Sequence, residues 1–511
     1  MKTIKKLAFV VLLLCFSVDL TVAEQTGLTC PNFFSDHMVL QRGQAVSLWG
    51  KAMPNAEVKV VFAGQTKSVK SSSSGSWRVL LDSMEASSEN RELLITSGDK
   101  TIRFKNVLVG EVWVASGQSN MQWTLPRSNM PKDELAKLNK PFVRIITFNR
   151  AISKSPKYEA TGTWEILDEK SGPRSSAVAS YFAMALNKEL NVPIGIISTS
   201  WGGTRIEPWT PAEGFDLVKE LGVQAKEVRA MDTSPEQKIQ RAKARVIELK
   251  QWLEGAEKSL AAGESLTVVP EESSAKRINN RSPGAIYNAM VKPIVGLAIK
   301  GAVWYQGESN VGEGLLYEKK MKALIEGWRK VWGRGDFPFY HVQLAPFGKY
   351  SGDRLAGIWE AQLFSTRSIV NTGMAVTTDI GNLRDIHPKN KSEVGRRLAL
   401  WALAKDYGKN IKYSGPLYKS YEIQEKNMVI SFEHAESGLA FKGESLKEVM
   451  IKGEGDAQFV AAKTEIKGSQ LIVAHPEGKK PQHVRMGWNK NALPNLMNKE
   501  GLPASPFRTD K

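Results

Sequence analysis

Cysteine is nearly absent from this sequence of 511 residues, which contains two of them, Cys15 and Cys30. Cys15 lies in an apolar leader that we expect to be removed, so Cys30 is left alone and an intrachain disulfide is excluded. The fold must therefore be stabilised by packed hydrophobic cores. An exported protein without disulfides fits a bacterial periplasm better than an animal extracellular space.

Histidine is scarce, and long apolar runs are missing. The chain has six histidines, and no group of His, Cys and Asp has the spacing of metal ligands, so we expect neither a metal nor another cofactor. Beyond the leader, no run approaches the roughly 20 apolar residues of a membrane span.

Acidic residues are in the minority, and the net charge is +17. A basic surface favours anionic partners. The basic residues are spread along the chain without a nucleic-acid-binding motif. The charge therefore indicates solubility and a preference for acidic substrates rather than binding to nucleic acids.

The N-terminus has the three parts of a secretory leader. Basic residues precede an apolar run from Leu7 to about Val18, and small residues follow as far as Ala23. This pattern predicts a signal peptide over residues 1–23 and a mature protein in the bacterial periplasm. The alternative is an N-terminal membrane anchor, for which the apolar run is short.

The pattern of secondary structure that the remaining sequence predicts changes twice along the chain. Residues 24–106 contain short alternating strands, such as 57–60, between turns rich in Ser, Gly and Asn, which predicts a sandwich-like β domain. From 107 to 408, apolar strands end in glycine-rich turns and alternate with helices, which predicts an α/β domain with a parallel sheet. Residues 409–511 return to short alternating segments and predict a second β-rich domain.

Helical spacing marks residues 177–190 and 393–405, and an insertion over about 212–280. In the insertion, Ser234 caps a long helix whose apolar residues follow three-four spacing until Gly263. We expect this apolar stripe to pack on the same chain; the alternatives are a dimerisation face and a lid.

A serine turn follows the first strand of the α/β part. The segment Gly117-Gln118-Ser119-Asn120-Met121 comes directly after the strand 111–116. A serine on a strand-to-helix turn is well placed for nucleophilic attack, and the N–H groups of the helix start suit a developing oxyanion. The alternative is an ordinary helix cap, for which serine and asparagine are also favoured.

Two other polar turns follow later strands. Gly202 and Gly203 come after the strand that ends at Ser200, and a bare glycine lets a backbone N–H approach a substrate carbonyl. Gln306 and Asn310 lie in the turn after the next strand. The carboxyl ends of parallel strands meet at one sheet edge, so we expect these turns near Ser119.

His387 is the best candidate for a general base, because it lies just before the helix 393–405 and next to Asp385. A neutral imidazole accepts the serine proton, and a carboxylate orients the ring. His341 falls within an apolar strand, where a structural role is favoured, and the remaining histidines lie in the β-rich flanks.

Together these segments resemble the sialate O-acetylesterases, a family within the SGNH-type serine hydrolases. The matching segments are Gly117–Met121, Trp201–Thr204, Trp304–Asn310 and Asp385–Pro388, with Phe34–Gln41 near the start and Gly501–Asp510 near the end. The resemblance spans nearly the whole mature chain. It implies a flavodoxin-like three-layer α/β/α SGNH-type hydrolase domain, flanked by the β-rich domains.

The resemblance also implies metal-free hydrolysis through an acetyl-enzyme. Ser119 would attack the ester, and His387 would carry the proton. The oxyanion would be held by the N–H of Ser119, by an N–H of Gly202 or Gly203, and by a side-chain amide, for which Gln306 is preferred to Asn310.

Two features depart from the usual superfamily pattern. Arg384 stands where an aspartate is expected three residues before the histidine. Asp385 is therefore the candidate third member; a Ser–His dyad assisted by a backbone carbonyl or by Asp379 is the alternative. The amide of Gln306 is also outside the usual glycine-x-asparagine frame.

An acidic sugar such as O-acetylated sialic acid suits the basic composition. Arg205 follows the glycine turn and is a candidate carboxylate clamp, or else an ion-pair partner of Glu207. Further candidate substrate-binding residues are Gln118, Asn120 and Glu308. The alternative functions are an acetylxylan or other polysaccharide acetylesterase and a non-catalytic glycan-binding protein. The oligomeric state is left open.

Overall fold

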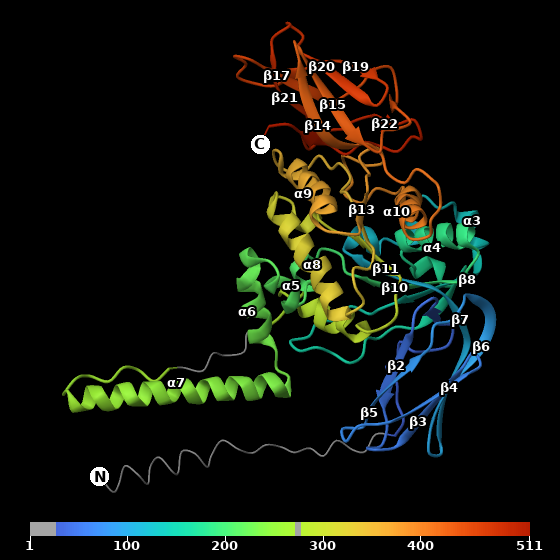
Figure 1. Ribbon diagram of the computed structural model, residues 1–511, viewed down its shortest axis with the longest axis vertical. Helices are drawn as coiled ribbons and strands as arrows, with labels where there is room; N and C mark the ends of the chain where they lie inside the picture. The colour runs from blue at the N-terminus through green and yellow to red at the C-terminus, as the bar shows by residue number, and fades with distance from the viewer. Residues whose placement is uncertain (1–26, 271–276, 511) are drawn as a thin grey trace.

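The structure is a computed structural model that describes residues 27–270 and 277–510, so the predicted signal peptide lies outside the described residues. Figure 1 shows a β-rich N-terminal part and a β-rich C-terminal part at opposite ends of a central α/β part. The prediction of an α/β protein with β-rich flanks is confirmed at this level. None of the described helices combines the length and the hydropathy needed to span a bilayer.

A largely parallel sheet forms the centre, in the order β13-β12-β11-β7-β10-β8-β9. Its strands are β7 (Lys100–Gly117), β8 (Asn139–Thr147), β9 (Trp164–Asp168), β10 (Ile194–Ser200), β11 (Gly301–Tyr305), β12 (Phe339–Val342) and β13 (Thr372–Ala375). Only the β8–β9 pair along this path is antiparallel. Every residue of β10 and β11 is buried, which explains why these strands are continuous apolar runs in the sequence.

Two helix pairs accompany the sheet. Helix α4 (Ala177–Leu190) packs against α10 (Lys391–Lys405), and α8 (Leu316–Trp332) packs against α9 (Arg354–Ser368). Helix α4 has the predicted bounds. Helix α10 begins before the predicted start, because the side chain of Asn390 caps it by accepting a hydrogen bond from a first-turn N–H. The shorter helices are α2 (Ser119–Gln122), α3 (Lys132–Ala136), α5 (Ala212–Asp216) and α6 (Gly222–Met231).

The N-terminal strands are joined to the central sheet through β7. These strands are β1 (Val39–Gln41), β2 (Val46–Lys51), β3 (Glu57–Phe62), β4 (Gln65–Lys70), β5 (Ser76–Leu81) and β6 (Ser87–Ser97). The first half of β7 pairs with β6, and its second half pairs with β10 and β11. One continuous hydrophobic core therefore runs from the N-terminal part into the central part.

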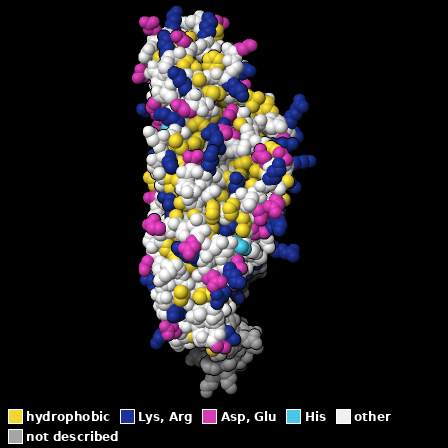
Figure 2. Space-filling view, turned by 90° about the vertical axis from the view of Figure 1, so that its right-hand side faces the viewer, with side chains coloured by type: hydrophobic (Ala, Val, Ile, Leu, Met, Phe, Trp, Pro, Cys, Tyr) yellow, Lys and Arg dark blue, Asp and Glu magenta, His cyan; other side chains and the backbone are white. Residues whose placement is uncertain are grey.

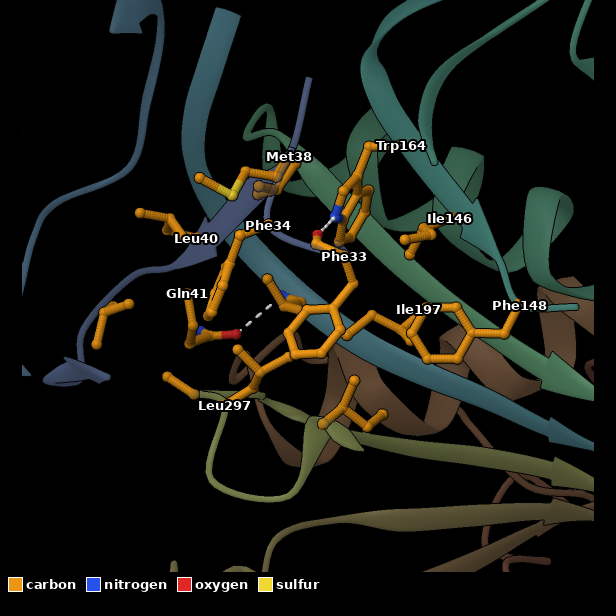
Figure 3. A pocket seen from close by; sticks show the side chains of 15 residues that line it. Phe33, Phe34, Met38, Leu40, Gln41, Ile146, Phe148, Trp164, Ile197 and Leu297 are labelled. Atoms are coloured by element: carbon orange, nitrogen blue, oxygen red, sulfur yellow. Dashed lines mark hydrogen bonds between the residues drawn. The ribbon is translucent and has the colours of Figure 1, made fainter. Parts of the chain in front are cut away.

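A small pocket lies in this shared core (Figure 3). Phe33 and Phe34 form part of its wall, together with Trp164, whose ring N–H donates to the carbonyl of Phe33 at 2.9 Å. The one polar side chain in the lining is Gln41, and its amide already bonds to Glu111 and to the N–H of Val112. The pocket therefore offers packing but no reactive group.

The C-terminal part has a hydrophobic core of its own. Its main sheets have the orders β14-β15-β20-β19 and β18-β17-β21-β23, and a third ladder pairs β16 with β22. The strands are β14 (Leu417–Gln424), β15 (Asn427–Glu433), β16 (Leu439–Phe441), β17 (Val449–Gly453), β18 (Val460–Ala461), β19 (Lys463–Lys467), β20 (Gln470–Ala474), β21 (Pro481–Met486), β22 (Leu496–Asn498) and β23 (Phe507–Arg508).

The long helix of the insertion is present, but its predicted packing is wrong. Helix α7 (Pro235–Ala261) starts at the Ser234 cap as expected, yet Figure 1 shows it projecting from the body of the molecule. Its apolar residues Ile239, Val246 and Leu260 are each more than half exposed. The three-four spacing required only a helix with one apolar face and did not specify a surface to cover it.

Candidate active site

The turn that carries Ser119 is held by close backbone packing. Gly117 ends β7 with a φ of 139°, and a Cβ there would lie 2.2 Å from the carbonyl oxygen of Tyr305. Any other residue would therefore clash with β11. The N–H of Gln118 donates to the same carbonyl at 2.9 Å, so the end of β11 fixes where α2 and Ser119 begin.

Ser119 and His387 are brought together from opposite ends of the α/β part. The Nε2 atom of His387 lies 2.9 Å from Oγ of Ser119, which is the distance needed for proton transfer between a nucleophile and its base. The indole of Trp123 stacks on the imidazole, with ring centroids 4.4 Å apart and an interplanar angle of 16°. This stacking holds the plane of the histidine ring.

Asp385 lies beside His387, but its carboxylate is too far from the imidazole ring for a hydrogen bond. Its carboxylate accepts a hydrogen bond from the backbone N–H of His387 at 2.9 Å, and it lies 3.8 Å from Nδ1, beyond hydrogen-bond range. The side chain of Asp385 is 45% exposed. Asp379 is engaged elsewhere, because both of its oxygens accept from the guanidinium of Arg397 at 2.6 Å.

The pKa of His387 is lowered from its ordinary value. Partial burial is the main cause, the positive charge of Lys391 adds to it, and the carboxylate of Asp385 opposes it. A lowered pKa keeps the imidazole neutral at physiological pH, and the neutral ring is the form that accepts a proton from serine.

A buried polar chain ties the two reacting loops together. The amide of Asn120 donates to Glu308 and, at 3.0 Å, to the backbone carbonyl of Ile386, the residue before His387. Its oxygen accepts from Lys391, whose ammonium lies 5.0 Å from the centre of the Tyr305 ring. Asn120 thus connects the serine turn directly to the histidine loop.

Burial perturbs both charged members of this chain. It raises the pKa of Glu308 and lowers the pKa of Lys391 to about 7. The sequence motifs do not single out Lys391. Its position at the start of α10, four residues after His387, is the available signal, but a lysine at a helix start usually faces solvent.

The amides of Gln306 and Asn310 are buried and already hydrogen-bonded. The Nε2 atom of Gln306 lies within 3.2 Å of acceptors on Gln118, Thr204 and Asn310. Asn310 in turn donates to Glu207 and Glu313. These side chains connect the serine turn, the glycine turn and the turn after β11, which lie together as the sequence predicts. Their amide groups, however, bond to one another and to neighbouring side chains.

The two glycines of the second turn have different surroundings. The N–H of Gly202 donates to the side-chain oxygen of Gln122 at 2.9 Å. A Cβ on Gly202 would also lie 3.2 Å from Cβ of Ser119. Gly203 has a φ of 76° and open space around the position of a Cβ. A side chain at position 202 would therefore crowd Ser119, whereas the space beside Gly203 is open.

Arg205 belongs to an ion-pair cluster. Its guanidinium contacts Glu207 and Glu313, and the buried ammonium of Lys320 lies 2.7 Å from Glu207 and 2.8 Å from Glu313. Two cations and two carboxylates thus balance. Within residues 27–270 and 277–510, no group of His, Cys, Asp and Glu side chains is arranged to hold a metal ion.

Comparisons with known proteins agree with one another. Residues 254–404 match the family described as carbohydrate esterase, sialic acid-specific acetylesterase. The sialate O-acetylesterase of Rattus norvegicus is 30% identical over 448 residues, which cover 80% of this chain and 79% of the rat protein. The Homo sapiens enzyme of that name is 30% identical over 442 residues, covering 78% and 75% of the two chains.

A solved structure extends the likeness to the whole fold. A carbohydrate acetylesterase from Xanthomonas citri superposes with a TM-score of 0.80 at 30% identity, covering 95% of this chain and all of the other. The shared fold and the length of the sequence matches together identify the chain as a carbohydrate esterase of the sialate O-acetylesterase family.

Proposed function

We propose that the protein removes O-acetyl groups from sialic acids through an acetyl-enzyme on Ser119. The observation that carries this proposal is the 2.9 Å contact between His387 Nε2 and Ser119 Oγ at the end of β7. The names of the curated relatives support the substrate. The acetylated sugar is the only partner that the proposal requires, and it involves no cofactor.

The reaction needs two proton transfers by the same imidazole. As Ser119 Oγ attacks the ester carbonyl, His387 takes the serine proton; it then donates that proton to the departing sugar hydroxyl. In the second half, His387 takes a proton from water, the resulting hydroxide attacks the acetyl-enzyme, and acetate leaves as Ser119 regains its proton. Trp123 and Asn120 keep the ring and the serine turn in register during both halves.

The oxyanion is assigned to backbone donors. The N–H of Ser119 lies at the start of α2, and the N–H of Gly203 is the second donor, because that of Gly202 is already bonded to Gln122. The amides of Gln306 and Asn310 have internal partners and act by holding the three turns together. Asp385 is the third member of the site. Its carboxylate orients His387 by accepting a hydrogen bond from the backbone N–H of His387 and by its negative charge.

We further propose the fine architecture that the resemblance implies. The parallel order of the central sheet and the two helix pairs support a three-layer α/β/α SGNH-type domain over residues 107–408, between β-rich domains over 24–106 and 409–511. A signal peptide over 1–23 and a periplasmic location complete this proposal.

Acetate release tests the function. The mature protein is supplied with O-acetylated sialic acid and, in parallel, with acetylated xylan, and the Ser119→Ala variant serves as the blank. Release from sialic acid that is absent in the variant supports the proposal. Release of acetate from xylan alone would support Ser119 as the nucleophile but assign a different substrate. A folded protein that releases acetate from neither substrate would contradict the proposal.

A further inference from the structure

A polar pocket lies beside the reacting serine. It has a volume of about 230 Å³ and is lined by residues from the carboxyl ends of β8 and β10 and from α2. Gln122 belongs to its lining and also bonds to Gly202, the glycine next to Ser119. Ser119 and Gln122 are three residues apart in one helical turn and therefore share a face. The pocket therefore adjoins the serine turn through Gln122, although Ser119 itself does not line it.

Three hydroxyl groups in the lining are open to a ligand, whereas that of Ser176 bonds to the backbone of Met121 and Ala179. Ser198 and Ser200 are 1% and 8% exposed, and together with Thr147 they line the pocket. No side-chain partner for these hydroxyls occurs among the described residues. The oxygens of Ser198 and Ser200 are not among the fully buried side-chain atoms without a partner, and Thr147 is exposed. These hydroxyls are therefore open to the cavity, where each can donate to and accept from a polar ligand.

One of the two guanidinium groups in the lining is also free. Arg174 is held by Glu165, with Nε of the arginine 3.0 Å from the carboxylate. Arg150 follows β8, is exposed to solvent, and has no acidic partner within residues 27–270 and 277–510. It is therefore available to an anion, whereas the charge of Arg205 is balanced by Glu207 and Glu313.

We propose that this pocket is the subsite for the sugar that carries the ester, and that Arg150 binds the carboxylate of an acidic sugar there. The inference rests on the proposed function and names the residues that select its substrate. The planar guanidinium of Arg150 matches a carboxylate with two parallel hydrogen bonds. The hydroxyls of Ser198, Ser200 and Thr147 receive the ring hydroxyls.

The pocket is suited to one sugar residue. Its volume of about 230 Å³ is below the roughly 300–1,000 Å³ of pockets that enclose drug-sized ligands. A longer glycan would therefore leave its remaining residues in solvent, on the side where Arg150 is exposed.

The test compares two substrates that differ only in the charge near Arg150. The kcat/KM values are measured for O-acetylated sialic acid and for its carboxyl methyl ester, in the wild type, Arg150→Gln and Arg174→Gln. We expect the wild type to prefer the free carboxylate by about tenfold, as one charge-assisted bidentate pair provides. Arg150→Gln abolishes this preference through KM, and Arg174→Gln retains it. Arg150→Lys, which keeps the charge but loses the fork, gives an intermediate preference.

A binding measurement separates failure of this inference from failure of the proposed function. Free sialic acid is titrated into Ser119→Ala by calorimetry, with and without Arg150→Gln. Binding that weakens about tenfold in the double variant supports the pocket assignment even if no acetate is released. An active wild type whose preference for the carboxylate survives in Arg150→Gln would overturn the inference and leave the esterase intact. Absence of binding in Ser119→Ala would also overturn it.

Discussion

The Ser119–His387 pair and the Glu207–Lys320 cluster both follow strands of the central sheet, but their surroundings differ. The side chain of His387 is 25% exposed, and Ser119 meets it through a single side-chain hydrogen bond. The side chain of Lys320 is 5% exposed and contacts two carboxylates. The reactive atoms of Ser119 and His387 are therefore accessible to a substrate, whereas each charged group of the Glu207–Lys320 cluster is already paired with a group of opposite charge.

This difference separates two kinds of polar residue near the active site: those that can contact a substrate and those that bond only within the protein. Gln306 and Asn310 stand in a segment that resembles the family, and Arg205 directly follows another, yet their polar atoms bond within the protein. Burying such a cluster requires each member to have a partner. Their contribution is therefore to the shape of the turns, and loss of one member should be felt as loss of stability more than as loss of chemistry.

The largest expected effect is on Ser119. Ser119→Ala removes the nucleophile and should lower kcat by at least about 10⁴-fold. The melting temperature should stay close to that of the wild type, since the serine hydroxyl makes one partly exposed contact. Acetate release and calorimetric unfolding check both statements; substantial residual turnover would rule out Ser119 as the nucleophile.

Next in size is a change within the buried cluster. Lys320→Met removes one of the two cations that balance Glu207 and Glu313 and leaves the charge of Arg205 alone against both. The variant should destabilise the fold by about 3–5 kcal/mol. Chemical denaturation followed by tryptophan fluorescence measures this. The comparison between the two sites would fail if the variant were as stable as the wild type but inactive.

Asp385→Asn should have a moderate effect on rate. A buried triad aspartate contributes about 10⁴-fold, but here the carboxylate is half exposed and 3.8 Å from Nδ1. We therefore expect a loss of about 10²-fold in kcat, with KM unchanged. A full 10⁴-fold loss would mean that the carboxylate closes onto the ring during the reaction, and an unchanged rate would indicate a dyad.

The pH profile should show a shifted acidic limb. His387 acts when neutral, and its pKa is lowered by burial and by Lys391, so kcat/KM should fall only below the ordinary histidine pKa of about 6.5. Lys391→Met removes the repelling charge, which makes the imidazolium easier to form. The acidic limb should then move to higher pH, and a thermal scan must show that the variant is folded. An unshifted limb would contradict the assigned cause.

The smallest effect is expected from Arg205→Gln. The arginine is 40% exposed and its charge is balanced, so the ratio of kcat/KM between sialate and its methyl ester should change by less than about twofold. A collapse of that ratio would return the carboxylate-binding role to Arg205 and remove it from Arg150.

The short-range features of the site could be predicted from sequence. Helix α4, the glycine turn before Ser119 and the position of His387 each depend on a few consecutive residues whose backbone requirements are local. Lys391 and Arg150 could not be assigned, because a buried lysine and a free arginine differ from ordinary surface cations only by what packs around them. Figure 2 illustrates the difficulty, since on that face lysine and arginine are interspersed with acidic residues everywhere.

Strand β7 has a consequence for how the enzyme is made. Its first half pairs with β6, its neighbour in sequence, but its second half pairs with β10 and β11, which come much later in the chain. For example, Gln118 and its hydrogen-bond partner Gln306 are 188 residues apart. During synthesis, an apolar strand edge therefore stays open until β11 has been made, and open edges favour association with other chains. The strand that delivers the nucleophile is also the one that most needs protection before folding is complete.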